Sequence, residues 1–322
     1  MTVPPLDRST IWPYVDGEPG EFYYSRSGNP TQAAAEAALG ELEGGEALLF
    51  SSGTGAATAV VLAFLAPGST IALAEGGYYG TSVLFRELER WGLRSVEFDQ
   101  RAEPPGDVDL IWLEAPSNPF LTMPDFEAAA GHPARVLVDA TAATPVYLQP
   151  LSQGADYVLH SATKFLTGHH DVLLGAVVCK DSGDAARLRE TRSRTGITAS
   201  PESAWLLHRG LQTLEVRMLR HTASAGEVAD RLEHHEAVER VRYPGFGGLL
   251  SFDVAGGAAA ARRVESATQR IVNATSLGGA VSTLETRRRW EGDRVPENLI
   301  RLSVGLEPLE ELWDDLNRAL SR

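Results

Sequence analysis

The sequence predicts an α/β protein, with a mostly parallel sheet covered by helices and a smaller C-terminal α/β domain. Short apolar runs alternate with helical segments from Thr31 to about Ser203. Parallel strands need long crossover connections, which helices usually provide, so this alternation is typical of a parallel sheet. The chain has 322 residues, enough for two domains with well-buried cores.

The elements of the larger domain follow from these runs. The stretch TQAAAEAALGELEGG predicts a helix from Thr31 that ends at Gly44 and Gly45, and TSVLFRELERWG is another helical segment. Residues before Thr31 are irregular and rich in Pro, Gly and aromatic residues, so we expect this arm to be ordered by packing on something else. Buried strands are predicted at 69–75, 93–99, 109–115, 135–141, 155–161 and 173–179.

The pattern changes at about Ser203. A long helical stretch runs to His235, and we expect it to bend near Gly210 or Gly226. Strand-like and helical segments follow, namely VERVRYP, LLSFDVAG, AAAARRVESATQ, IRLSVGLE and LEELWDDLNRAL. We therefore predict an arm at 1–28, a large domain at 29–217 and a small domain at 218–322.

Composition excludes several classes of function. The formal net charge of −14 disfavours nucleic-acid binding, since phosphates would be repelled. No apolar run approaches the roughly 20 residues that span a bilayer, and the N-terminus lacks the pattern of a secretory signal. The lone Cys179 excludes an internal disulfide and is expected in a buried strand, and His169 and His170 lack a third metal ligand at suitable spacing. We expect a cytoplasmic enzyme or binding protein with no metal, membrane or nucleic-acid partner.

Polar residues stand where the predicted strands end, which is where open α/β sheets bind ligands. Asp139 ends one strand, and a buried carboxylate needs a cationic partner. HSATKFLTGHHD ends another with Ser161, Thr163 and Lys164, although a lone lysine is more often a solvated surface charge. The turn at Gly53–Thr54 leads into a helix whose backbone N–H groups suit a phosphate, but a purely structural turn has similar features.

One ligand, pyridoxal 5′-phosphate, would use all of these groups. Lys164 would bond to its aldehyde, and Asp139 would pair with its pyridinium nitrogen. The phosphate would be held by Ser161, Thr163 and the Gly53–Thr54 amides. A tyrosine of the stretch GGYYGT would stack on the ring.

Several motifs in order resemble the Cys/Met-metabolism family of pyridoxal-phosphate enzymes. They are YSRSGNPT, LEGGEALLFSSGTGA, YYGT, HSATKFLTGHHD, SLGGAVS and IRLSVGLE, and together they run from about Tyr23 to the C-terminus. The resemblance implies the fold of type I pyridoxal-phosphate transferases. It also implies a homo-oligomer, a tetramer built from dimers that share active sites.

The resemblance implies roles for individual residues. Lys164 is the lysine that bonds to the cofactor, Asp139 the partner of the ring nitrogen, and Tyr78, at the family's spacing from Phe85, the stacking residue. Tyr78 is also implied as an acid/base group whose pKa is lowered by cations such as Arg26. Tyr24 and Arg26 are implied to contact the phosphate of a neighbouring subunit. Asn118 would lie beside the ring hydroxyl. Arg301 and Ser276 would hold the carboxylate end of the substrate.

The implied activity is that of a carbon–sulfur lyase on a small sulfur amino acid, most like a cystathionine γ-lyase. Cystathionine γ-synthase and O-acylhomoserine sulfhydrylase would use the same residues, and a pyridoxal-phosphate-binding or other α/β binding protein without turnover stays open. The chain departs from the family pattern at Ala140, Tyr79, Thr275 and the stretch ETRRRWEGDRVPEN, and Gly80 stands where methionine γ-lyases have cysteine. The arginines of that stretch suit a second substrate carboxylate, and a solvated loop is the open alternative.

Overall fold

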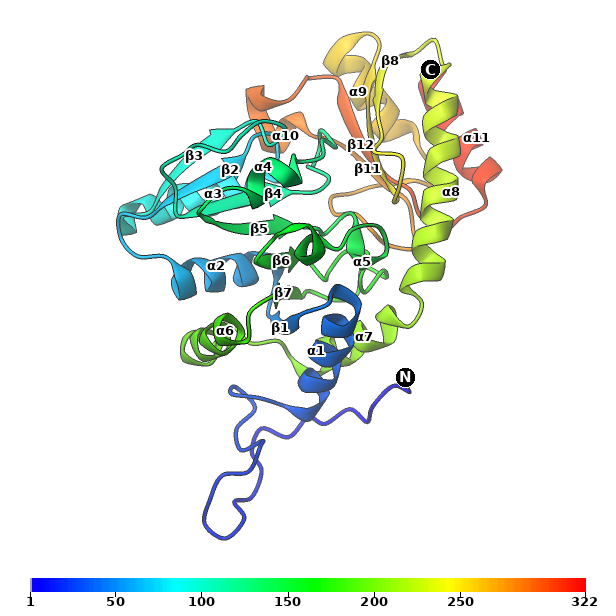
Figure 1. The fold of residues 1–322 in the computed structure, drawn as a ribbon. Coiled ribbons are helices and arrows are strands. Elements are labelled where there is room, and N and C mark those ends of the chain that lie inside the picture. The colour runs from blue at the N-terminus through cyan, green and yellow to red at the C-terminus, as the bar shows by residue number, and fades with distance from the viewer. Residues whose placement is uncertain (1) are drawn as a thin grey trace.

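The computed structural model describes residues 2–322 and contains two sheets (Figure 1). The larger sheet has the strand order β1-β7-β6-β5-β4-β2-β3, and the smaller has the order β10-β11-β12-β9-β8. In the larger sheet β3, β2, β4, β5 and β6 run parallel, whereas β7 is antiparallel to both of its neighbours. The predicted fold class, an α/β protein with a mostly parallel sheet and a smaller C-terminal sheet, is confirmed.

The strands of the larger sheet are β1 Glu46–Phe50, β2 Thr70–Ala74, β3 Arg94–Phe98, β4 Leu110–Glu114, β5 Arg135–Asp139, β6 Tyr157–His160 and β7 Gly175–Cys179. Its helices are α1 Pro30–Glu43, α2 Gly53–Phe64, α3 Tyr79–Leu88, α4 Phe126–Ala130, α5 Thr144–Tyr147, α6 Ser182–Thr195 and α7 Pro201–Leu211. Three 3₁₀ turns lie at Glu89–Trp91, Pro150–Gln153 and Gly292–Arg294.

The long helix α8, Leu214–Glu233, leads into the smaller sheet, and Figure 1 shows it running beside that sheet. The strands there are β8 Val238–Arg242, β9 Leu249–Val254, β10 Val272–Asn273, β11 Thr283–Thr286 and β12 Leu299–Ser303. The helices are α9 Gly257–Ala267, α10 Arg288–Glu291 and α11 Leu309–Leu320. The division of the chain at residues 28 and 217 stays a prediction.

The two faces of the larger sheet bury different cores, because side chains alternate along each strand. On β5, Leu137 packs with the apolar residues of α2 and α6, whereas Val136 and Val138 belong to a core that continues into α8 and the smaller sheet. Cys179, at the end of β7, is fully buried, as predicted. The core on one face of the larger sheet thus continues into the smaller sheet, and residues 275–277, 287 and 301 lie close to the strand ends of the larger sheet.

Two details differ from the sequence-based expectations, and the bend expected near Gly210 or Gly226 lies near Gly210. Strand β3 was expected to be buried, but it lies at the sheet edge and Val96 is 40% exposed. Strand β1 was not predicted, although it is as long as several strands that were, and its apolar run follows directly on the predicted helix end at Gly44 and Gly45. The helical stretch after Ser203 divides between α7 and α8, close to Gly210, whereas Gly226 lies inside the continuous α8.

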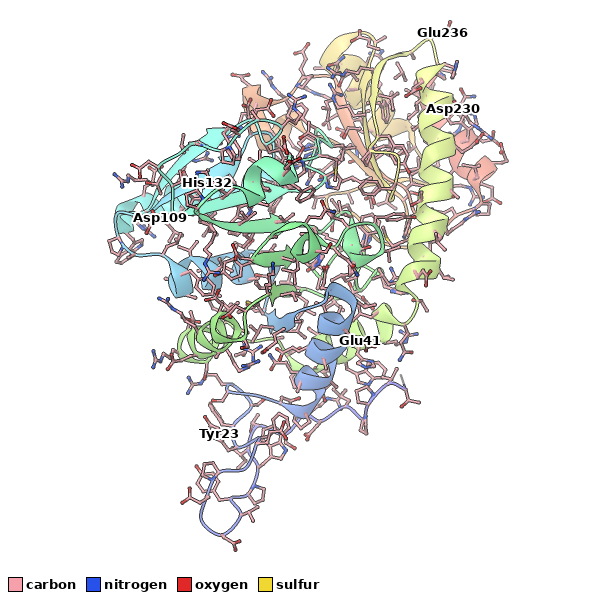
Figure 2. All side chains as sticks on the ribbon, viewed as in Figure 1. Tyr23, Glu41, Asp109, His132, Asp230 and Glu236 are labelled. Carbon is pink, nitrogen blue, oxygen red and sulfur yellow. The ribbon has the colours of Figure 1, made fainter. Side chains whose placement is uncertain are left out.

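Residues 2–29 form an arm that leaves the body of the molecule, and Figure 2 shows Tyr23 on it. Among residues 2–29, β-type pairing is limited to the isolated bridges Ile11–Tyr24 and Val15–Glu18. The arm exposes apolar side chains, including Ile11, Tyr14 and Val15. Across residues 2–322, no helix has the length and apolar character that a membrane crossing requires.

Candidate active site

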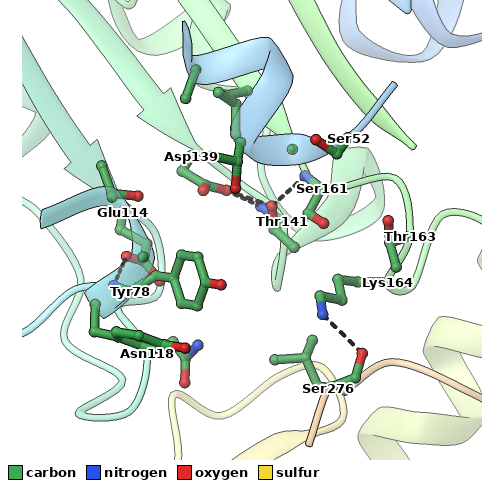
Figure 3. Close-up of a pocket in the computed structure, with 18 of the residues that line it drawn as sticks. Ser52, Tyr78, Glu114, Asn118, Asp139, Thr141, Ser161, Thr163, Lys164 and Ser276 are labelled. Carbon is green, nitrogen blue, oxygen red and sulfur yellow. Dashed lines mark hydrogen bonds between the residues drawn. The ribbon is translucent and has the colours of Figure 1, made fainter. Parts of the chain in front are cut away.

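A cavity opens at the carboxyl ends of β4, β5 and β6, between the larger sheet and residues 275–277, 287 and 301 of the C-terminal part (Figure 3). Parallel strands end on one edge of their sheet, so groups far apart in sequence meet there. The cavity collects most of the residues that the sequence analysis singled out, namely Gly53, Thr54, Tyr78, Asn118, Asp139, Ser161, Thr163, Lys164, Ser276 and Arg301.

Lys164 lies in the turn that follows β6, and its side chain points into the cavity (Figure 3). Its Nζ donates a hydrogen bond of 2.8 Å to Ser276 Oγ. Burial, and secondarily the Arg301 guanidinium, lower the pKa of Lys164 to about 8. Lys164 is therefore not a solvated surface lysine, and its lowered pKa makes the neutral, nucleophilic amine accessible at mildly alkaline pH.

Ser276 has a backbone φ of +82°, which side-chain-bearing residues seldom adopt. Its hydroxyl accepts from Lys164, while its carbonyl accepts from Arg301 Nη2 at 2.9 Å. One residue thus connects the amine to the predicted carboxylate clamp. Such strained backbone conformations cluster at functional sites.

Asp139 is the last residue of β5, and its carboxylate is held by the loop that follows. Its Oδ1 accepts from Thr141 N at 3.0 Å and from Thr141 Oγ1 at 2.5 Å. Burial raises the pKa of Asp139, and the Thr141 hydrogen bonds oppose that effect. Thr141 Oγ1 also accepts from Ser161 N at 2.8 Å, which ties Asp139 to the loop of Lys164. The departure at Ala140 leaves this arrangement intact, because Ala140 is fully buried away from the cavity.

A cradle of small residues lies at the N-terminus of α2. Ser52 is the N-cap of this helix and accepts from Gly55 N at 2.9 Å. A Cβ at Gly53 would lie 3.0 Å from Ser161 Cβ, so glycine allows the two loops to approach. The Thr163 hydroxyl is engaged with the backbone of Leu174. Free N–H groups and the helix dipole favour an anion here.

Tyr78, the N-cap residue of α3, forms the wall opposite Lys164 (Figure 3). Its backbone N–H donates to Glu114 Oε2 at 2.6 Å. Burial raises the pKa of Tyr78, with Tyr79 adding to the effect, although Arg287 and Arg301 lower it. The expected lowering of this pKa by Arg26 does not occur within the chain, because Arg26 lies on the arm and donates to Ser193 O at 2.6 Å.

Tyr24 and Arg26 do not line the cavity of their own chain. The Arg26 guanidinium lies over the Tyr24 ring at 5.2 Å. Their role toward a phosphate therefore requires the arm to reach a neighbouring subunit, and it stays a prediction.

Arg301, on β12, is buried at the cavity wall. It donates to Asn118 Oδ1 at 3.0 Å, to Ser276 O at 2.9 Å and to Glu285 Oε1 at 2.6 Å. Burial, and next the neighbouring Arg287, lower the pKa of Arg301 to about 10, which leaves it a cation at neutral pH. Fixed in this way, it suits the α-carboxylate of an amino acid.

Several residues that line the cavity were not expected from the sequence, among them Glu114, Thr141 and Ser52. Glu114 ends β4 as Asp139 ends β5, so the same signal, an acid after an apolar strand, pointed to it. Burial raises the pKa of Glu114 well above its ordinary value, and the nearby Asp139 adds to the effect. A solvated loop at ETRRRWEGDRVPEN is wrong for Arg287, which is 1% exposed and also lines the cavity.

The donor set fits pyridoxal phosphate. The cavity is lined by four kinds of group, and each matches a different part of that molecule. The Lys164 amine matches the aldehyde, Asp139 the ring nitrogen, the N-terminus of α2 the phosphate and Tyr78 the face of the ring. Across residues 2–322, no group of three or more His, Cys, Asp or Glu side chains is arranged to hold a metal ion.

Fold and site together define a pyridoxal-phosphate-dependent enzyme. Residues 2–321 match the family described as Cys/Met metabolism PLP-dependent enzyme. The chain belongs to this family, and pyridoxal 5′-phosphate is its cofactor.

Relatives within the family carry several names. The chain is 39% identical to a putative cystathionine gamma-lyase of Streptomyces coelicolor, over 95% of this chain and 86% of that one. It is 38% identical to the cystathionine gamma-synthase of Mycobacterium tuberculosis, over 95% and 88%. The crystal structure of cystathionine gamma synthase from Xanthomonas oryzae pv. oryzae in complex with cystathionine has a TM-score of 0.94 and 33% identity, and the match covers 99% of this chain and 92% of that one. Trans-sulfuration chemistry is thus common to these relatives, while the reaction differs among them.

Proposed function

We propose that the protein is a cystathionine γ-lyase, which converts L-cystathionine and water into L-cysteine, 2-oxobutanoate and ammonia. The observation that carries the proposal is the position of Ser276 between the Lys164 amine and the Arg301 guanidinium. An amino acid held by its α-carboxylate at Arg301 would have its Cα within reach of the amine that must move protons there.

The cofactor would be held by Lys164, Asp139, the Gly53–Thr54 amides, Ser161 and Thr163, and it supplies the electron sink for carbanions. Asp139, at the end of β5, would keep a proton on the ring nitrogen. Lys164 would take the proton from Cα of the substrate and a second proton from Cβ. Elimination at Cγ needs both transfers, so a mobile base is required.

Tyr78 would supply a proton to the departing sulfur. Burial keeps the pKa of its phenol above the ordinary value, so the group is protonated at neutral pH and serves as an acid. Asn118, held by Arg301, would position the ring hydroxyl of the cofactor.

One observation favours the lyase: one relative is named a putative cystathionine gamma-lyase. The family resemblance also disfavours a methionine γ-lyase, whose cysteine would fall at Gly80. The second candidate is γ-replacement, as in cystathionine γ-synthase or O-acylhomoserine sulfhydrylase, because other relatives are named cystathionine gamma-synthase.

The test is product analysis with two substrate sets. We expect 2-oxobutanoate and cysteine from L-cystathionine, and slow thioether synthesis from an O-acylhomoserine with cysteine or sulfide. Efficient thioether synthesis without 2-oxobutanoate would instead establish the replacement reaction, and pyruvate with homocysteine would establish a β-lyase. Bound cofactor without any of these products would identify a protein without turnover. The Lys164→Ala variant is the inactive control.

A further inference from the structure

Arg287 follows β11 and is almost fully buried while lining the cavity. Burying a guanidinium is costly unless it is paired. Its Nη1 donates to Glu285 Oε1 at 2.6 Å, and its Nη2 and Nε donate to Glu291 Oε1 at 2.8 and 3.3 Å. These bonds use one N–H of each nitrogen, so within the described residues the second N–H of Nη1 and of Nη2 stays available to a ligand.

Glu285 places Arg287 beside Arg301. Its Oε1 accepts from both guanidinium groups at 2.6 Å, and its Oε2 accepts from Trp290 Nε1 at 2.9 Å. Arg301 is also bonded to Ser276, the partner of Lys164, whereas Arg287 has no such bond. Arg301 is therefore the cation nearer to the Lys164 amine. Arg287 is a second cation, separated from Arg301 by the Glu285 carboxylate that both of them contact.

Aromatic rings cover this second cation. The Tyr79 ring lies 5.8 Å from the Arg287 guanidinium and 6.2 Å from the Trp290 ring, to which it is nearly parallel. It also meets the Tyr78 ring edge-on at 5.2 Å. Tyr79 and the Arg287 segment, two of the departures from the family pattern noted above, are thus in contact with each other.

We propose that Arg287 binds a carboxylate at the far end of the substrate side chain, with Tyr79 forming the apolar wall along which that side chain lies. Substrates with two carboxylates are then preferred over those with an uncharged end. The inference concerns binding in the proposed active site, and it names the substrate class for that site.

The test compares two unreactive amino acids of equal chain length, L-2-aminoadipate, which ends in a carboxylate, and L-norleucine, which ends in a methyl group. Their affinities are measured by titrating the pyridoxal-phosphate-loaded enzyme and following its visible absorbance. We expect the wild type to prefer aminoadipate by about tenfold or more, the effect of one charge-assisted hydrogen bond. Arg287→Met abolishes this preference and leaves norleucine affinity within about threefold.

Arg288→Met is the matched control, because Arg288 bonds to the exposed Asp293 and does not line the cavity. We expect it to keep the preference. If Arg287→Met fails to fold or to load the cofactor, Glu291→Gln tests the idea in the opposite direction, since removing a competing carboxylate raises aminoadipate affinity. Equal affinities in the wild type, equal losses for both ligands in Arg287→Met, or no gain in Glu291→Gln would overturn the proposal. Formation of 2-oxobutanoate from cystathionine reports the proposed function separately, so either idea can fail alone.

Discussion

At the residue scale, the site depends on Lys164 being an amine rather than an ammonium group. Burial removes the charged form from water, and the neighbouring Arg301 cation opposes protonation further. The resulting pKa of about 8 lies below the ordinary value for lysine, so the nucleophilic form is populated at mildly alkaline pH.

This pKa predicts how the cofactor-free protein takes up pyridoxal phosphate. The uptake rate should rise with pH, reach half of its maximum near pH 8 and level off above that, because only the neutral amine attacks the aldehyde. The measurement is the time course of absorbance near about 420 nm after mixing, across a pH series. Arg301→Gln should move the midpoint upward, since one opposing cation is gone. A midpoint above about 10, the ordinary lysine value, would contradict the assignment.

Tyr78 provides a second prediction at this scale. Tyr78→Phe should bind the cofactor, because the ring remains, but should lose γ-elimination by about a hundredfold, since the acid is absent. Steady-state rates of 2-oxobutanoate formation from cystathionine test this. Tyr79→Phe is the control, because it removes a neighbouring phenolic hydroxyl and should keep its activity. A Tyr78→Phe variant with the full rate would remove Tyr78 from the proposed mechanism.

At the element scale, α8 holds the loop that carries Lys164. Arg217, 5% exposed on this helix, donates to the carbonyls of Phe165, Leu166 and Gly210 at 2.6, 3.2 and 2.8 Å. The backbone of the catalytic turn thus bonds to the helix that leads into the smaller sheet. Burial lowers the pKa of Arg217 to about 10, so it is still charged at neutral pH.

Removing this contact should loosen the turn. Arg217→Met should destabilise the protein by about 2–4 kcal/mol, because several buried carbonyls lose their donor. Thermal unfolding of the cofactor-loaded protein measures the effect. Arg220→Met, an exposed position on the same helix that bonds to Glu307 O, should change little. Equal stability of the two variants would mean that Arg217 does not hold the loop.

At the scale of the whole molecule, the arm is the part without a core of its own. It exposes Ile11, Tyr14 and Val15 and leaves Tyr24 and Arg26 outside the cavity of its own chain. Apolar side chains in this number favour packing on another subunit. We expect the protein to assemble as a tetramer built from dimers, with arms reaching neighbouring sites.

Mixing two inactive variants tests this expectation. Lys164→Ala lacks the amine, and Arg26→Gln lacks the arm cation. If the arm acts on a neighbour, a hybrid dimer contains one site with both native groups, so activity returns after the subunits are exchanged. If the arm acts within its own chain, no native site forms and activity stays low. Sedimentation of each mixture checks that assembly has occurred.

The sequence alone was enough to predict the α/β fold class and the positions of most strands, because these depend on local period and spacing. It also named Lys164, Ser161 and Thr163, which stand in one contiguous motif, and Asp139, because a charge after an apolar strand is visible in the sequence; all four line the cavity. Strand β1 was missed, although it is as long as several strands that were predicted.

Only the tertiary structure decided which charges are buried and paired. Arg287, Arg288 and Arg289 are identical in sequence terms, yet Arg287 alone among them lines the cavity, while Arg288 bonds to Asp293 and Arg289 to Glu265. The exposed position of β3 and the link from Lys164 through Ser276 to Arg301 likewise depend on how distant segments meet. Burial and ion pairing depend on residues that are distant in the sequence and close in space. A surface arginine and a cavity arginine therefore cannot be told apart from the sequence.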